Sequence, residues 1–189
     1  MSRGTAPALA GLVLAVGIEM IAGGPARGAE SPRLHPGAVE IGLAGALTSV
    51  EGNARATVAA RAGSFLAARS GLAGFEVEVG YDHDRVLDGL DVEGALSWQH
   101  PVGSEALYPF ASLGGGVRWE SVGSFSQVRY PLGFALGMRA LVGTRAAVRI
   151  GYRYRRITHD PAADFTEHQF LTGLSLLFRN PHAPAPAGR

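Results

Sequence analysis

Residues 74–82 have the sequence GFEVEVGYD, in which apolar and polar side chains alternate with a period of two. Alternation over this length predicts a β-strand with one apolar and one polar face. The odd-numbered residues form the apolar face, and the even-numbered face carries Glu76, Glu78 and Asp82. Similar alternation recurs along residues 37–178, where turn-like segments separate the alternating stretches.

Eight alternating stretches are present, and none of the segments has the periodicity of a helix. Each stretch is close to the ~9–11 residues that a tilted membrane strand needs. Successive hairpins then predict an all-β fold, an eight-stranded antiparallel up-and-down transmembrane β-barrel. The stretches cover residues 38–47, 54–63, 74–82, 90–99, 107–120, 130–140, 151–160 and 165–178.

Alternation alone does not say which face points outward, because a soluble lipocalin-like barrel hides its apolar face and a membrane barrel exposes it. Aromatic residues favour the membrane barrel, since two aromatic belts bracket the apolar band of such proteins. One predicted belt comprises Phe75, Trp98 and Phe178, and the other comprises Tyr81, Trp119, Tyr130 and Tyr154. The expected location is therefore the bacterial outer membrane.

The ends of the chain differ in composition from this region. Residues 1–28 combine Arg3, an apolar run over residues 7–18 and small residues, which predicts a secretory signal peptide. Residues 179–189 are rich in proline and alanine and predict a disordered tail after the barrel of residues 37–178.

The net charge of +1 gives no footprint for nucleic acid. The absence of cysteine excludes disulfides and thiolate chemistry. The six histidines lack the ligand spacing of a metal site, so we expect neither a metal nor a cofactor. The oligomeric state stays open.

The polar faces of several strands carry opposite charges. An eight-stranded barrel is narrow enough for side chains from opposite walls to meet, and arginine pairs well with carboxylates. We therefore expect a network of ion pairs in the lumen; a charge-lined pore is the alternative. Its predicted members are Glu76, Glu78, Asp91 and Glu93 with Arg139, Arg149 and Arg153, and Arg145 and Arg155 share the same face.

The stretch GYRYRRITHD, residues 151–160, places a charged and a hydroxyl side chain on the face predicted to meet lipid. Arg156 and Thr158 are even-numbered and share the parity of Tyr152 and Tyr154, that is, the same side of the strand. With this stretch, residues 108–178 resemble the lipid A 3-O-deacylase (acyloxyacyl hydrolase-like) family of eight-stranded outer-membrane barrels. That family carries G-Y-R-[FY]-x-H-x-S-N on its penultimate strand and an acid or amide entering the last strand. The resemblance implies hydrolysis of an ester-linked acyl chain by an activated hydroxyl group, without a cofactor.

Carried over residue by residue, the resemblance matches Gly151 to Tyr154 and departs at the reactive positions. Arg156 takes the place of the histidine, and arginine stays protonated and cannot act as a base. Thr158 takes the place of the serine, and His159 that of the asparagine. The acidic position falls at Thr166 or Glu167, and His168 is an alternative base for Thr158.

Three functions follow from these residues. The first is a non-catalytic outer-membrane barrel that is structural or binds lipopolysaccharide, with Arg155, Arg156 and His159 near the lipid phosphate. The second is a divergent acyl-ester hydrolase acting on lipid A through Thr158, Glu167 and His168. The third is a narrow channel. The partner in the first two is outer-membrane lipid.

Overall fold

The structure is a computed structural model, and it describes residues 34–50, 53–83, 88–103, 106–143, 145–159 and 164–179. The predicted signal peptide lies outside the described residues, and so does the predicted tail apart from Arg179. No helix in these ranges is long and apolar enough to cross a membrane.

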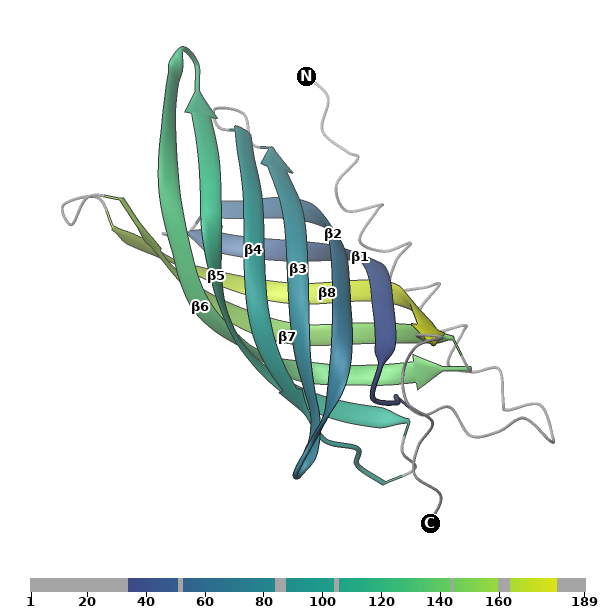
Figure 1. The fold of residues 1–189 in the computed structure, drawn as a ribbon. Helices are drawn as coiled ribbons and strands as arrows, with labels where there is room; N and C mark the ends of the chain where they lie inside the picture. The colour runs from purple at the N-terminus through teal and green to yellow at the C-terminus, as the bar shows by residue number, and fades with distance from the viewer. Residues whose placement is uncertain are drawn as a thin grey trace.

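Eight antiparallel strands close into one barrel in which each strand pairs with its neighbour in sequence and β1 pairs with β8, as predicted (Figure 1). Each strand contains most of one alternating stretch, but the strands run up to five residues further at their ends, and β7 ends two residues before its stretch does. They are β1 (Ala38–Val50), β2 (Asn53–Ala68), β3 (Gly71–His83), β4 (Asp88–Gln99), β5 (Leu107–Val122), β6 (Phe125–Val142), β7 (Ala146–Thr158) and β8 (Phe165–Arg179).

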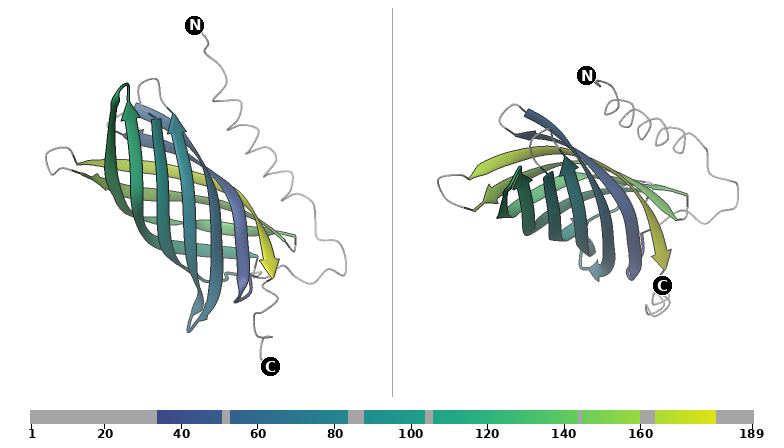
Figure 2. Two further views of the ribbon diagram at one scale, coloured as in Figure 1. Left: turned by 45° about the horizontal axis from the view of Figure 1, so that its top comes forward. Right: turned by 90° about the horizontal axis from the view of Figure 1, so that it is seen from above.

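The strands are inclined as they wrap round the barrel (Figure 2). A path across the strands along paired residues leads from Val39 through Phe75, Leu113 and Tyr154 and returns to β1 at Ser49, ten residues further on. This stagger and the number of strands set the diameter, and eight strands leave an interior that side chains can fill.

The apolar face of the barrel points outward, as predicted. On β3, Phe75 and Tyr81 are exposed, whereas Glu76 and Asp82 are buried inside the barrel. An exposed apolar band around a buried charged interior is the arrangement of a transmembrane barrel and excludes the soluble alternative. The fold and this outer face together place the protein in the bacterial outer membrane.

The end of the barrel where β1 begins and β8 ends, here called the termini end, is closed by apolar side chains. Leu34 precedes β1, and its backbone N–H donates a hydrogen bond of 3.0 Å to the Tyr108 hydroxyl. Gly37 turns the chain with φ of 81° and donates to the Phe65 carbonyl at 2.6 Å. The buried cluster comprises Leu34, Ala38, Phe65, Leu72, Tyr108, Leu141, Ala147 and Leu177.

A charge on the outer face should destabilise the barrel most near its middle. Leu136 is 53% exposed and pairs with Tyr152, the central residue of β7. We expect Leu136→Arg to lower the free energy of unfolding by about 2–4 kcal/mol, because arginine is costly at mid-membrane.

The matched control is Ser126→Arg near the tip of the β5–β6 hairpin, where the cost falls to about 0–1 kcal/mol. Urea unfolding in lipid vesicles measures both. Equal stabilities of the two variants would show that the outer face is not in lipid.

Candidate functional site

The interior of the barrel holds a network of ion pairs between side chains from all eight strands. Among the described residues, eight arginines pair with eight carboxylates, so the network is neutral as a whole. The arginines are Arg55, Arg61, Arg118, Arg129, Arg139, Arg149, Arg153 and Arg155, and the acids are Glu40, Glu76, Glu78, Asp82, Asp91, Glu93, Glu120 and Glu167.

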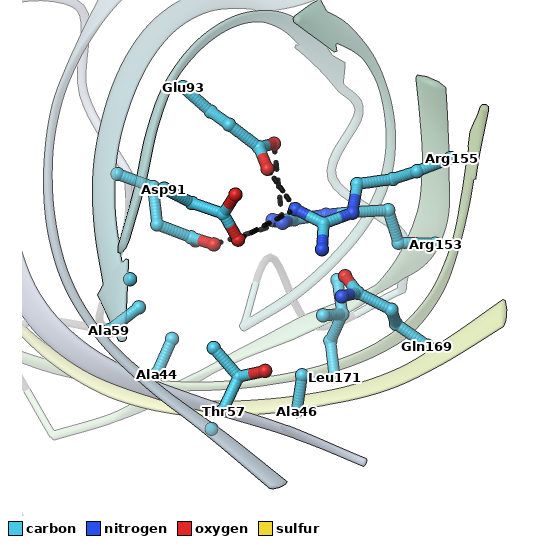
Figure 3. A pocket seen from close by; sticks show the side chains of 13 residues that line it. Ala44, Ala46, Thr57, Ala59, Asp91, Glu93, Arg153, Arg155, Gln169 and Leu171 are labelled. Carbon is cyan, nitrogen blue, oxygen red and sulfur yellow. Dashed lines mark hydrogen bonds and ion pairs between the residues drawn. The ribbon is translucent and has the colours of Figure 1, made fainter. Parts of the chain in front are cut away.

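The predicted lumenal residues on β7 meet acids from the opposite wall. Arg149 bonds Glu76 at 2.5 Å, and Arg153 bonds Glu78 at 2.9 Å. Figure 3 shows Arg153 and Arg155 pointing towards Asp91 and Glu93 across the lumen. The structure therefore brings together the acids of β3 and β4 and the arginines of β7.

Arg118 on β5 joins acids of three other strands to this network, although the sequence did not single it out. It lies 2.7 Å from Asp82 on β3, 3.8 Å from Asp91 on β4 and 3.0 Å from Glu167 on β8. On its own strand it lies 2.9 Å from Glu120. Its parity on β5 indicated a polar face, but its partners depend on the stagger of the whole barrel.

Glu40 on β1 was missed for the same reason and bonds Arg139 at 2.7 Å. The prediction that Arg145 faces the lumen is wrong. Arg145 lies on the turn before β7 and is exposed. The alternation of β7 starts one residue later, at Ala146.

Little space remains between these side chains. Two cavities in the lumen have volumes of about 10 Å³ and about 30 Å³, and both are lined by Glu78, Glu93, Arg153 and Arg155. A cavity of ~10–15 Å³ holds a single water molecule. The described side chains thus fill the lumen at this level and leave room for isolated waters.

The outer face of β7 and β8 carries the positions that resemble a catalytic strand. The Arg156 side chain is 63% exposed, and its Nη2 lies 3.0 Å from Oδ2 of Asp164, which directly precedes β8. The Thr158 hydroxyl donates to the Tyr130 carbonyl at 3.1 Å. His159 follows the last residue of β7 and is exposed.

His168 is too far from Thr158 to serve as its base, so that prediction is wrong. His168 pairs with Tyr154, which lies four residues before Thr158 on β7. Four residues of a strand span about 13 Å. The Nδ1 atom of His168 instead bonds the Tyr152 hydroxyl.

Two further predictions fail because of the face on which the side chains lie. Glu167 is buried in the lumen with Arg118 and Arg155, so it cannot orient a group on the outer face. Arg155 is bound in the same network and cannot contact lipid. The acid that does lie next to position 156 is Asp164, which we did not foresee because it lies in a turn, where alternation carries no information.

No group of three or more potential metal ligands was found among the described residues. The outer-face residues offer hydroxyl, imidazole, guanidinium and carboxylate groups, but the described contacts bring no imidazole to Thr158.

Comparison with solved structures gives small eight-stranded outer-membrane barrels. Neisserial surface protein A (NspA) matches with a TM-score of 0.57 at 15% identity, covering 75% of this chain and 96% of that one. The N-terminal barrel domain of Pseudomonas aeruginosa OprF gives 0.56 at 13% identity, covering 76% and 98%. The outer membrane enzyme PagL gives 0.50 at 13% identity, covering 72% and 97%.

The shared feature is the fold. A scan against family models gave no match, and neither did a comparison with curated proteins. The resemblance to lipid A deacylases therefore stays a prediction from the motif.

Removing one member of the lumenal network should destabilise the barrel. We expect Arg149→Ala to cost about 3 kcal/mol, because it removes the 2.5 Å partner of buried Glu76. Arg145→Ala is the matched control and should change stability by less than about 0.5 kcal/mol, since Arg145 is exposed. Unfolding by urea in vesicles measures both, and equal losses would contradict the assignment.

Proposed function

We propose that the protein is a closed, non-catalytic outer-membrane barrel that binds a phosphorylated lipid, such as lipopolysaccharide, on the outer face of β7 and β8. The observation that carries this proposal is the position of Arg156. It is the one arginine of β7 that leaves the lumen, and its side chain is 63% exposed on the face that meets lipid.

The end of the barrel opposite the termini, here called the far end, suits such a ligand. With the start of β1 and the end of β8 on the periplasmic side, β7 runs outward and Arg156 lies towards the cell surface. Tyr130 and Tyr154 lie on the same outer face, as aromatic residues do at a membrane interface. A guanidinium there offers charge-assisted hydrogen bonds to a lipid phosphate.

Catalysis is disfavoured by the same residue. Ester hydrolysis by a hydroxyl needs a neutral base within about 3 Å of it. Arg156 holds the position where the family places that base and stays protonated. The described partner of the Thr158 hydroxyl is a backbone carbonyl, which accepts its hydrogen bond without removing the proton.

A divergent acyl-ester hydrolase remains the second candidate because Asp164 lies beside position 156. In that position, the Asp164 carboxylate could orient a histidine at position 156. A channel is disfavoured, since paired charged side chains line the lumen and the two cavities between them have volumes of about 10 and 30 Å³.

Fatty-acid release from lipid A tests the absence of catalysis. We expect none from the wild-type protein in detergent. The double variant Arg156→His with Thr158→Ser should show slow release, because it restores the base and the smaller nucleophile. Adding Asp164→Asn to this variant should lower the rate about 10²-fold or more, since the orienting acid is lost.

Release by the wild-type protein that is lost in Thr158→Ala would overturn the proposal in favour of the hydrolase. Arg156→His combined with Thr158→Ala, which has the base but no nucleophile, is the blank that corrects for contaminating hydrolases.

A further inference from the structure

The ion pair between Arg156 and Asp164 is unequal in its exposure. The Arg156 side chain is 63% exposed, whereas that of Asp164 is 15% exposed. One nitrogen of the guanidinium bonds Asp164, and a guanidinium has five N–H donors in all. Most of the donors of Arg156 therefore remain able to bind a second anion on the outer face.

Asp164 has one described arginine partner, whereas each acid of the lumenal network has two. Its Oδ2 bonds Arg156 at 3.0 Å, and its Oδ1 is buried without a hydrogen-bond partner among the described residues. A buried carboxylate oxygen without a donor is costly. The bond to Arg156 thus satisfies only half of this carboxylate, and nothing else described here pairs with it.

A phosphate group is a stronger ligand for the same guanidinium. A phosphate monoester carries about −1.5 to −2 charges at neutral pH and three acceptor oxygens. It can accept two parallel bonds from arginine, which a partly buried carboxylate bonded to one nitrogen does not do here. Thr166 pairs with Arg156 across the strands and is exposed, so its hydroxyl is available beside the arginine.

We infer that Asp164 is a built-in competitor that sets the affinity of Arg156 for a lipid phosphate monoester at the membrane surface. The phosphate displaces Asp164 from Nη2 of Arg156, and the repulsion between the two anions weakens the complex. This inference rests on the proposed lipid binding and adds its regulation: affinity rises wherever the charge of Asp164 is removed.

Titration of the full-length folded barrel in zwitterionic micelles with dihexanoyl phosphatidic acid tests this inference. We expect Asp164→Asn to bind about fivefold more tightly than wild type, since an exposed ion pair contributes up to ~1 kcal/mol. Arg156→Gln should abolish binding in both backgrounds. Asp88→Asn is the matched control, because Asp88 is another exposed acid on the outer face at the far end. This variant should bind the lipid with the same affinity as wild type.

The outcomes separate the two claims. If Asp164→Asn binds the lipid no more tightly than wild type while Arg156→Gln loses binding, Asp164 is not a competitor, but Arg156 is still the lipid site. Unchanged binding by Arg156→Gln overturns the lipid site itself, and with it the competitor. An equal gain in Asp88→Asn would assign the effect to net charge and overturn the competitor.

Two further arms define the ligand. Inorganic phosphate should bind far more weakly than the lipid, and equal binding would replace the lipid by the free anion. Dihexanoyl phosphatidylcholine should not compete, because it lacks the monoester. Should Asp164→Asn fold poorly by circular dichroism, Asp164→Ser removes the same charge and gives the same expected gain.

Discussion

Arginine–carboxylate pairing inside a narrow barrel is the interaction on which the rest of this structure depends. A charge in such an interior is destabilising unless a partner and further hydrogen bonds satisfy it. Here each arginine of the lumen meets an acid from another strand, for example Arg118 with Asp82 and Glu167. The network is possible because eight strands bring opposite walls within the reach of two side chains.

Towards the termini end, the ionic network borders the buried apolar cluster. Arg139 lies 4.8 Å above the ring of Phe65, which belongs to the apolar cluster at the termini end. Arg149 lies 3.9 Å from the ring of Phe110, which belongs to a second buried apolar cluster with Ala135 and Leu171. Cation–π contacts thus join the two chemically different parts of the interior.

The sequence predicted much of this fold because period two is a local property. In residues 74–82 and 130–140 the alternation separated the two faces correctly, and the aromatic residues indicated which face meets lipid. Parity also placed Arg156 on the outer face. Parity says nothing about height along the barrel, which depends on the register of each hairpin. His168 and Thr158 have outer-face parity but lie at different heights, and Asp164 lies in a turn where no alternation exists.

The same limit applies to the network. Its acids and arginines were recognisable as members of one polar face, but the pairing of Glu40 with Arg139 joins residues 99 positions apart. Such contacts depend on the stagger of ten residues around the closed barrel, which no single strand encodes. Composition and parity therefore predicted a charged lumen, and closure decided which charges meet.

Conductance across a planar bilayer tests the central claim, that this network closes the lumen. The wild-type protein should give no steady current after insertion, with insertion verified on the same membranes and a porin as positive control. A stable open-pore conductance of the wild-type barrel would contradict the account, because ions would then be passing where the structure places paired arginines and carboxylates.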